Sequence, residues 1–238
     1  MIIGLGGSAT NDGGAGMAAA LGIRFLDADH KPIPPVPLDL TERLVEVDDS
    51  ERIALPLVVA ACDVTNPLLG PAGATRVFGR QKGADETTMP MLESALARLV
   101  ETSAGWDEAQ APGAGAAGGL GFGLLRFAGA ELKSGFDLIA DLTGLEEAVK
   151  TTDLVITGEG SLDVQSLSGK GPVALARMAR RHGKRIVAFC GRADESVRES
   201  GVFDEIFELR GTGLPVDELI DRAADLLETL AAKSALPA

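Results

Sequence analysis

The sequence predicts an α/β protein with parallel sheets and helices on both faces. Two observations predict it: apolar, β-branched runs recur along the 238 residues, and segments of helical periodicity separate them. Near-continuous apolar strands are typical of parallel sheets, because the helical crossovers that join such strands bury both faces. The predicted strands are residues 2–5, 23–27, 55–62, 153–160, 185–191 and 205–209.

The predicted helices follow from spacing and from start signals. A first helix is expected around residues 16–22, beginning after Asp12. The longest amphipathic segment, 85–106, carries leucines at helical spacing, and Pro90 marks its true start because proline is tolerated only in a first turn. A C-terminal helix is predicted over 216–233. We expect these last two helices only to pack.

Composition excludes several classes of function. A net charge of -13 disfavours a nucleic-acid partner, and no apolar run is long enough to span a membrane. Cys62 and Cys190 lie far apart in apolar runs without metal-site spacing, so we expect two buried free thiols in a reducing cytoplasm. No signal peptide precedes the first strand, which follows Met1 directly, as if the chain began in the middle of a fold.

The first glycine-rich loop, residues 4–14, invites a nucleotide-binding interpretation. It fits the dinucleotide pattern G-x-G-x-x-A, with Asp27 at the distance of a ribose-binding acid. The polar turn before the helix argues against that interpretation, and a Walker A motif is excluded because no Gly-Lys-Ser/Thr follows. What remains is a loop of N–H groups, and Asp12 is either a helix cap or a ligand of Mg²⁺ or a substrate hydroxyl.

The second candidate loop spans residues 154–172. A predicted strand ends at Gly158-Glu159-Gly160, and ligands bind outside the carboxyl ends of parallel strands. Asp163 and Gln165 follow, and Lys170 lies beside the positive end of a helix that Gly171-Pro172 opens. Lys170 is either a solvated loop lysine or part of a phosphate site, which the neighbouring acids and glycines favour.

The third candidate loop, residues 61–85, combines an acid with cations. Asp63 follows an apolar strand, and Arg76, Arg80 and Lys82 could neutralise an anionic substrate. The glycine-dense stretch 111–129 packs on another backbone or admits a ligand; glycine permits both. Acids, glycine loops and lysine without a catalytic histidine fit phosphoryl transfer, in which positioning and charge stabilisation dominate.

Four blocks resemble, in order, the signature blocks of the bacterial class I glycerate kinase family. They are "GLGGSATNDGGAGMAAALG", "ACDVTNPLLGPAGATRVFGRQKGA", "PGAGAAGGLGFGLL" and "DLVITGEGSLDVQSLSGKGPVALARMA". The resemblance implies an ATP- and Mg²⁺-dependent kinase of D-glycerate with two unlike α/β domains. Residues 1–168 would be the middle domain, and 169–238 the C-terminal half of a Rossmann-like domain whose N-terminal half is absent, so this shortened chain could be inactive. Residues 189–210 match the family loosely.

These observations together give the expected site, with the loops at 4–13 and 158–170 facing one cleft. Asp12, Asp63 and Asp163 share the catalytic roles, Asp63 and Asp163 as Mg²⁺ ligands and Asp163 favoured as general base. The expected ATP-binding residues are Gly6, Gly7, Ser8, Thr10, Asn11, Gly158, Glu159, Gly160 and Lys170. The expected glycerate-binding residues are Arg80, Lys82 and Gln165.

Two alternatives stay open at this stage. One is an NAD-dependent dehydrogenase that uses Asp27 on the ribose. The other is a non-catalytic remnant that acts as a binding domain, with open sheet edges and apolar surface that favour partner capture or aggregation. The sequence leaves open which glycerate hydroxyl is phosphorylated and whether the chain is a homodimer.

Overall fold

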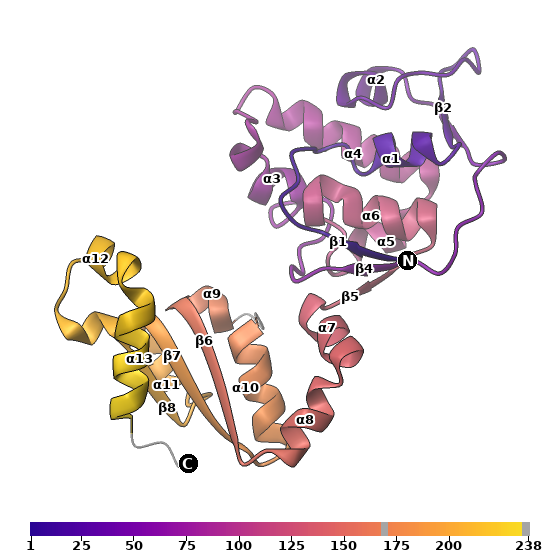
Figure 1. The fold of residues 1–238 in the computed structure, drawn as a ribbon. Helices are drawn as coiled ribbons and strands as arrows, with labels where there is room; N and C mark the ends of the chain where they lie inside the picture. Colours follow the sequence, from indigo (N-terminus) through magenta and orange to yellow (C-terminus); the bar gives the residue numbers. More distant parts are fainter. Residues whose placement is uncertain (168–170, 235–238) are drawn as a thin grey trace. The chain divides into compact units, whose positions relative to one another are not determined.

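The computed structural model describes residues 1–167 and 171–234 (Figure 1). The chain divides into two compact units, Met1–Gly135 and Phe136–Ala238. Both contain parallel sheets flanked by helices, which confirms the predicted fold class. None of the helices in the described ranges has the length and apolar character that crossing a bilayer requires.

The first unit is built on a short parallel sheet in the order β1-β4-β5. Its strands are β1 (Ile2–Gly4), β4 (Val59–Ala61) and β5 (Glu131–Lys133). Gly4 pairs in register with Ala61, and Ala61 with Lys133, so the three strands end at the same edge. The loops that follow them are therefore neighbours at the carboxyl edge, where α/β proteins place their ligands.

The helices of this unit form around one apolar core. They are α1 (Ala15–Ala20), α2 (Pro37–Glu42), α3 (Ala74–Phe78), the 3₁₀ helix η1 (Arg80–Lys82), α4 (Met89–Ser103), α5 (Trp106–Gln110) and α6 (Ala116–Ala128). The start of α4 is as predicted, with Pro90 in its first turn. Leu96 and Leu99 of α4 are fully buried beside Phe122 of α6.

The expected strand at 23–27 forms, but it does not join the parallel sheet. β2 (Arg24–Leu26) pairs antiparallel with β3 (Glu46–Asp48). The reason is local: Asp27 accepts hydrogen bonds from the N–H groups of Asp29 and Lys31 and folds the chain back after β2. The returning chain then lies beside β2, where Pro32 forms an antiparallel bridge with Leu26 and the Ile33 N–H donates a hydrogen bond to the Phe25 carbonyl oxygen.

The second unit contains a parallel sheet in the order β6-β7-β8. Its strands are β6 (Leu154–Leu162), β7 (Arg185–Ala193) and β8 (Glu205–Glu208). Its helices are α7 (Gly135–Thr143), α8 (Leu145–Thr151), α9 (Val164–Leu167), α10 (Gly171–Arg181), α11 (Glu195–Glu199), the 3₁₀ helix η2 (Leu209–Thr212), α12 (Val216–Asp221) and α13 (Ala223–Lys233). In Figure 1, α10 covers one face of β6 and β7, and α12 and α13 lie over the other.

Two sequence-based expectations differ from this second unit. The boundary expected at residue 168 falls inside the unit, because β6 pairs along its length with β7 and so belongs to the same sheet as the later strands. The predicted C-terminal helix breaks at Arg222 into α12 and α13. No described residue of α13 is fully buried, so α13 packs less closely than α4, and the expectation that this segment only packs stays a prediction.

Candidate active site

The loop after β1 presents main-chain N–H groups without protein partners. Within the described part of the chain, the N–H groups of residues 6 to 12 donate no hydrogen bond to any protein atom. Gly7 has a φ of 63°, a conformation that glycine adopts at little cost. A run of unpaired N–H groups at the carboxyl edge of a parallel sheet is the arrangement that binds phosphate and other anions.

Asp12 closes this loop by accepting hydrogen bonds from N–H groups at the start of α1, whose N-cap residue is Gly14. Its Oδ1 accepts a hydrogen bond from the N–H of Gly14 at 3.1 Å, and its Oδ2 accepts one from Gly16 at 3.0 Å. The structure thus supports the capping interpretation of Asp12. Each carboxylate oxygen keeps a further lone pair, so capping leaves Asp12 able to accept another hydrogen bond or to bind a cation.

The two glycine-rich stretches of this unit pack directly on each other. A Cβ atom on Gly118 would lie 1.9 Å from the Thr10 carbonyl oxygen, and one on Gly119 would lie 2.7 Å from Cα of Gly13. Ala117, Gly118 and Gly119 have positive φ angles and kink α6 where it meets the loop. Of the two interpretations of residues 111–129, the structure supports close backbone packing.

Lys82 reaches the glycine loop from η1. Its Nζ donates a hydrogen bond to the Thr10 carbonyl oxygen at 2.8 Å. Partial burial lowers the pKa of Lys82, and the nearby Asp12 carboxylate opposes that shift. Arg80, by contrast, is exposed and forms an ion pair with Glu86. Of these two expected substrate cations, only Lys82 contacts the loop.

Asn11 is anchored by a residue that the sequence did not single out. Its Nδ2 donates a hydrogen bond at 3.0 Å to Oγ1 of Thr75, which is fully buried in α3. The Asn11 Oδ1 atom is buried and has no hydrogen-bond partner among the described residues. A buried acceptor without a donor costs about 1–3 kcal/mol, so this orientation of Asn11 is held against a local cost.

Asp63 follows β4 at the same edge of the sheet. Its Oδ1 accepts a hydrogen bond from the N–H of Gly135 at 2.8 Å, which ties the loop after β4 to the end of β5. The neighbouring Cys62 is only half-buried, and burial raises the pKa of its thiol. The expectation of two fully buried thiols is therefore wrong for Cys62 and confirmed for Cys190, where burial raises the pKa to about 11.

Of the expected acids of the second unit, Glu159 lies inside β6 and Asp163 directly follows the end of that strand. Asp163 and Ser166 bond reciprocally: Ser166 N–H donates to Oδ1 of Asp163, and Asp163 N–H donates to Oγ of Ser166, both at 3.2 Å. Ser166 Oγ also donates to Oε2 of Glu159 at 3.3 Å. The Ser166 hydroxyl, which sequence reasoning missed, thus links the main chain of Asp163 to the Glu159 carboxylate.

The glycines at 158 and 160 do not form the loop that the sequence suggested. Gly158, Glu159 and Gly160 lie inside β6, which continues to Leu162, with Gly158 opposite Phe189 and Glu159 opposite Cys190 of β7. Lys170 lies outside the described residues, as does the Gln165 side chain. The phosphate site expected around Lys170 therefore stays a prediction.

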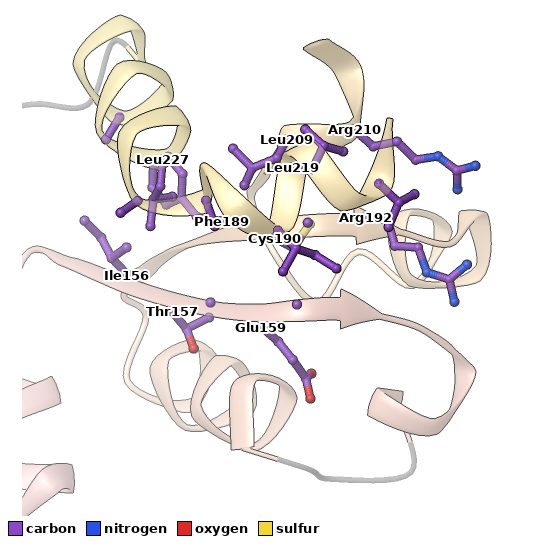
Figure 2. Close-up of a pocket in the computed structure, with 18 residues that line it drawn as sticks. Ile156, Thr157, Glu159, Phe189, Cys190, Arg192, Leu209, Arg210, Leu219 and Leu227 are labelled. Carbon is purple, nitrogen blue, oxygen red and sulfur yellow. The ribbon is translucent and has the colours of Figure 1, made fainter. Parts of the chain in front are cut away.

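A pocket of about 1250 Å³ lies between the sheet of the second unit and its C-terminal helices (Figure 2). Ile156, Phe189, Leu219 and Leu227 give it an apolar lining. Figure 2 shows the Glu159 side chain pointing to the opposite side of the sheet from α12 and α13. The pocket and the β6 edge, which no other described strand covers, agree with the expectation of apolar surface and an open sheet edge.

The donor atoms of the first unit suit Mg²⁺ only together with a substrate. In the described part of the chain, no group of three or more Asp, Glu, His or Cys side chains could hold a metal ion. Mg²⁺ needs no such cage, because it commonly binds one or two carboxylates together with substrate phosphates and water. Asp63 and Asp163, the expected ligands, lie in different units.

The position of Asp27 contradicts the dehydrogenase interpretation. In a dinucleotide fold this acid ends a strand that lies parallel to the first one. Here it follows β2 of the antiparallel pair, and its Oδ2 accepts a hydrogen bond from Arg43 at 3.1 Å. The hydrogen bond from the Lys31 N–H is the largest of the contacts that lower the pKa of Asp27. Asp27 is thus a structural turn residue.

Comparison with known proteins places the chain in one family. A family model described as "Glycerate kinase family" matches residues 1–236. The glycerate kinase of Halalkalibacterium halodurans is 42% identical over 97% of this chain, and the glycerate 2-kinase of Escherichia coli is 41% identical over 94%. A crystal structure from Salmonella typhimurium LT2, assigned as glycerate kinase 2, superimposes with a TM-score of 0.70 at 40% identity and covers 87% of this chain.

The match covers only part of each relative. The chain spans 63% of the H. halodurans protein, 61% of the E. coli protein and 55% of the Salmonella chain. Within this chain, however, the match to the family model extends over residues 1–236 and so includes all the loops described above. The chain belongs to the glycerate kinase family.

Proposed function

We propose that this protein catalyses ATP-dependent phosphoryl transfer to a hydroxyl group of D-glycerate. The observation that carries the proposal is the run of N–H groups from Gly6 to Asp12, after β1, that have no hydrogen-bond partner among the residues the structure describes. Fixed N–H dipoles there would stabilise the charge on phosphoryl oxygens without reorganising during the reaction. The named relatives support glycerate as the acceptor.

The residues around this loop suit the other requirements of the reaction. The Lys82 ammonium, held on the Thr10 carbonyl, lies at the loop and would neutralise a phosphate or the glycerate carboxylate. Asp63 is exposed at the neighbouring strand end, where a carboxylate can hold Mg²⁺ together with nucleotide phosphates. Bound Mg²⁺ would neutralise charge on the phosphates.

We propose that Asp163 is the general base that accepts the proton of the glycerate hydroxyl. Its carboxylate is oriented by the N–H of Ser166. A positioned general base typically accelerates such a transfer by about 10²–10⁴-fold. Asp12 is already committed to two N–H groups, and we give it a supporting role in shaping the loop.

Coupled measurement of ADP formation tests the proposal. We expect ADP to appear only when D-glycerate, ATP and Mg²⁺ are all present, and glycerol, which lacks the carboxylate, to be a poor substitute. Asp163→Ala should lower kcat by about 10²-fold or more. Full turnover in Asp163→Ala would remove this residue from the mechanism while leaving the reaction itself intact.

A binding function without catalysis is the competing proposal, favoured by the apolar pocket of the second unit. A monodisperse, cooperatively melting protein that binds neither ATP nor glycerate would support it.

We further propose that the protein works in the cytoplasm and as a homodimer. Light scattering coupled to size-exclusion chromatography tests the homodimer.

A further inference from the structure

Thr75 uses both its side chain and its main chain to hold the candidate site. The residue is fully buried in α3, a short helix of the first unit. Its Oγ1 accepts the hydrogen bond from Nδ2 of Asn11, 64 positions away in the sequence. Its carbonyl oxygen accepts a hydrogen bond at 2.9 Å from the N–H of Gly79, the residue that precedes η1.

These two contacts belong to a closed ring of hydrogen bonds and chain segments. From Gly79 the chain turns through η1, where the N–H of Lys82 donates to the Gly79 carbonyl oxygen at 2.9 Å. Nζ of Lys82 then donates to the carbonyl oxygen of Thr10, and Thr10 is followed directly by Asn11. The ring thus runs from Thr75 through Gly79, Lys82, Thr10 and Asn11 back to Thr75.

The ring has little steric freedom. A Cβ atom on Gly79 would lie 2.4 Å from the Thr75 carbonyl oxygen. A Cβ atom on Gly118 would lie 2.8 Å from Nζ of Lys82, besides its overlap with Thr10. At Gly79 and Gly118 the ring is therefore closely packed against neighbouring atoms. The parts of the ring that can change without a steric clash are its hydrogen bonds.

We infer that Thr75 is a positioning residue that fixes the glycine loop and the Lys82 ammonium relative to each other. Among the described residues, no hydrogen bond joins Thr75 to the N–H groups of residues 6 to 12; it acts through Asn11 and through η1. The kinetic consequence rests on the function proposed above. Because a misplacement of about 1 Å can cost about 10²-fold in rate, loss of one link should reduce catalysis without removing a catalytic group.

The test separates the hydroxyl of Thr75 from its volume. Thr75→Val keeps the branched shape and removes the acceptor for Asn11, whereas Thr75→Ser keeps the acceptor and removes a methyl group. Ser103→Ala is the matched control, because Ser103 is also a buried hydroxyl of this unit but bonds to the Leu99 carbonyl within α4. Asn11→Ala breaks the same bond from the other side.

Two readouts are independent of activity. Acetic anhydride labelling, quantified by peptide mass spectrometry, reports how well Lys82 is held. Amide hydrogen exchange of Leu5 and of residues 13–16, whose N–H groups are hydrogen-bonded, reports the loop. We expect Thr75→Val and Asn11→Ala to raise both, and Thr75→Ser and Ser103→Ala to resemble the wild type. In the glycerate kinase assay we expect kcat/KM to fall roughly 10- to 100-fold in Thr75→Val and to recover in Thr75→Ser.

The outcomes distinguish the positioning role from the proposed function. Unchanged labelling and exchange in Thr75→Val would overturn the positioning role, whatever the kinetics. Equal effects in Thr75→Ser and Thr75→Val would also overturn it, since volume and not the hydroxyl would then matter. Altered labelling in a chain whose wild type forms no ADP with glycerate would support the positioning role and contradict the proposed function.

Discussion

Gly118 shows how a single position without a side chain shapes the glycine loop. Its missing Cβ leaves room for the carbonyl oxygen of Thr10, and the same carbonyl receives the Lys82 ammonium. The sequence identified residues 111–129 as glycine-dense but could not tell backbone packing from ligand approach. That distinction depends on which segment lies opposite, and the opposite segment is about a hundred residues away in the chain.

Gly118→Ala should therefore destabilise the protein strongly. The left-handed conformation at φ 71° costs an alanine about 1–2 kcal/mol, and the overlap with Thr10 adds about 1–3 kcal/mol of overpacking. Gly129→Ala is the control, because Gly129 has a φ of 63° but open space around its Cβ position. Chemical denaturation measures both; equal losses of unfolding free energy would show that the contact with Thr10 does not matter.

Asp85 makes stability depend on pH in the acid range. Hydrogen bonds from Thr87 and Thr88 lower the pKa of Asp85 from its ordinary 3.8 to about 2. Between these values the unfolded chain binds the proton more tightly than the folded one, so the stabilisation is complete above pH 3.8 and is lost as the pH falls toward 2.

We expect Asp85→Ala to be less stable than the wild type at about pH 6 and to approach it near the folded-state pKa of about 2. Urea unfolding across this range provides the measurement. Asp49→Ala is the control, since Asp49 is an exposed loop aspartate whose carboxylate accepts no hydrogen bond within the described ranges. A stability difference between wild type and Asp85→Ala that does not change with pH would contradict the assignment.

At the scale of elements, local sequence signals predicted where helices begin. Pro90 marked the start of α4, and Asp12 marked the turn into α1, because caps and first turns depend on neighbouring residues. The sequence could not show that β2 leaves the parallel sheet or that Gly158 lies inside β6. Strand partners are set by contacts between distant segments, which periodicity does not record.

The outer edge of β6 is the element most exposed to unintended pairing. The Ile156 side chain is 52% exposed, and no other described strand pairs with that edge. We expect Ile156→Lys to reduce self-association, because a charged residue on an edge strand discourages further pairing. Leu142→Lys, a similar change at an exposed position of α7, should have less effect. Equal solubilisation by both variants, measured by light scattering, would show that general charge and not the edge is responsible.

At the scale of the whole molecule, the sequence predicted the fold class and the family but not the division of the chain. The four signature blocks identified the family that the comparisons show. The boundary expected at residue 168 missed the division after Gly135, because β6 pairs with a strand that comes later in the chain. The site roles of Asp12, Asp63 and Lys82 stay predictions, whereas Thr75 carried no sequence signal of its own, since its proposed role exists only through Asn11.

A chimera measures most directly whether this chain carries a working glycerate kinase site. The chain would replace the matching stretch of the H. halodurans glycerate kinase, to which it is 42% identical, and folding would be checked by circular dichroism. We expect the chimera to form ADP only when D-glycerate and Mg²⁺ are present, and Asp163→Ala to abolish most of that activity. A cooperatively folded chimera that forms no ADP with D-glycerate would contradict the proposed function.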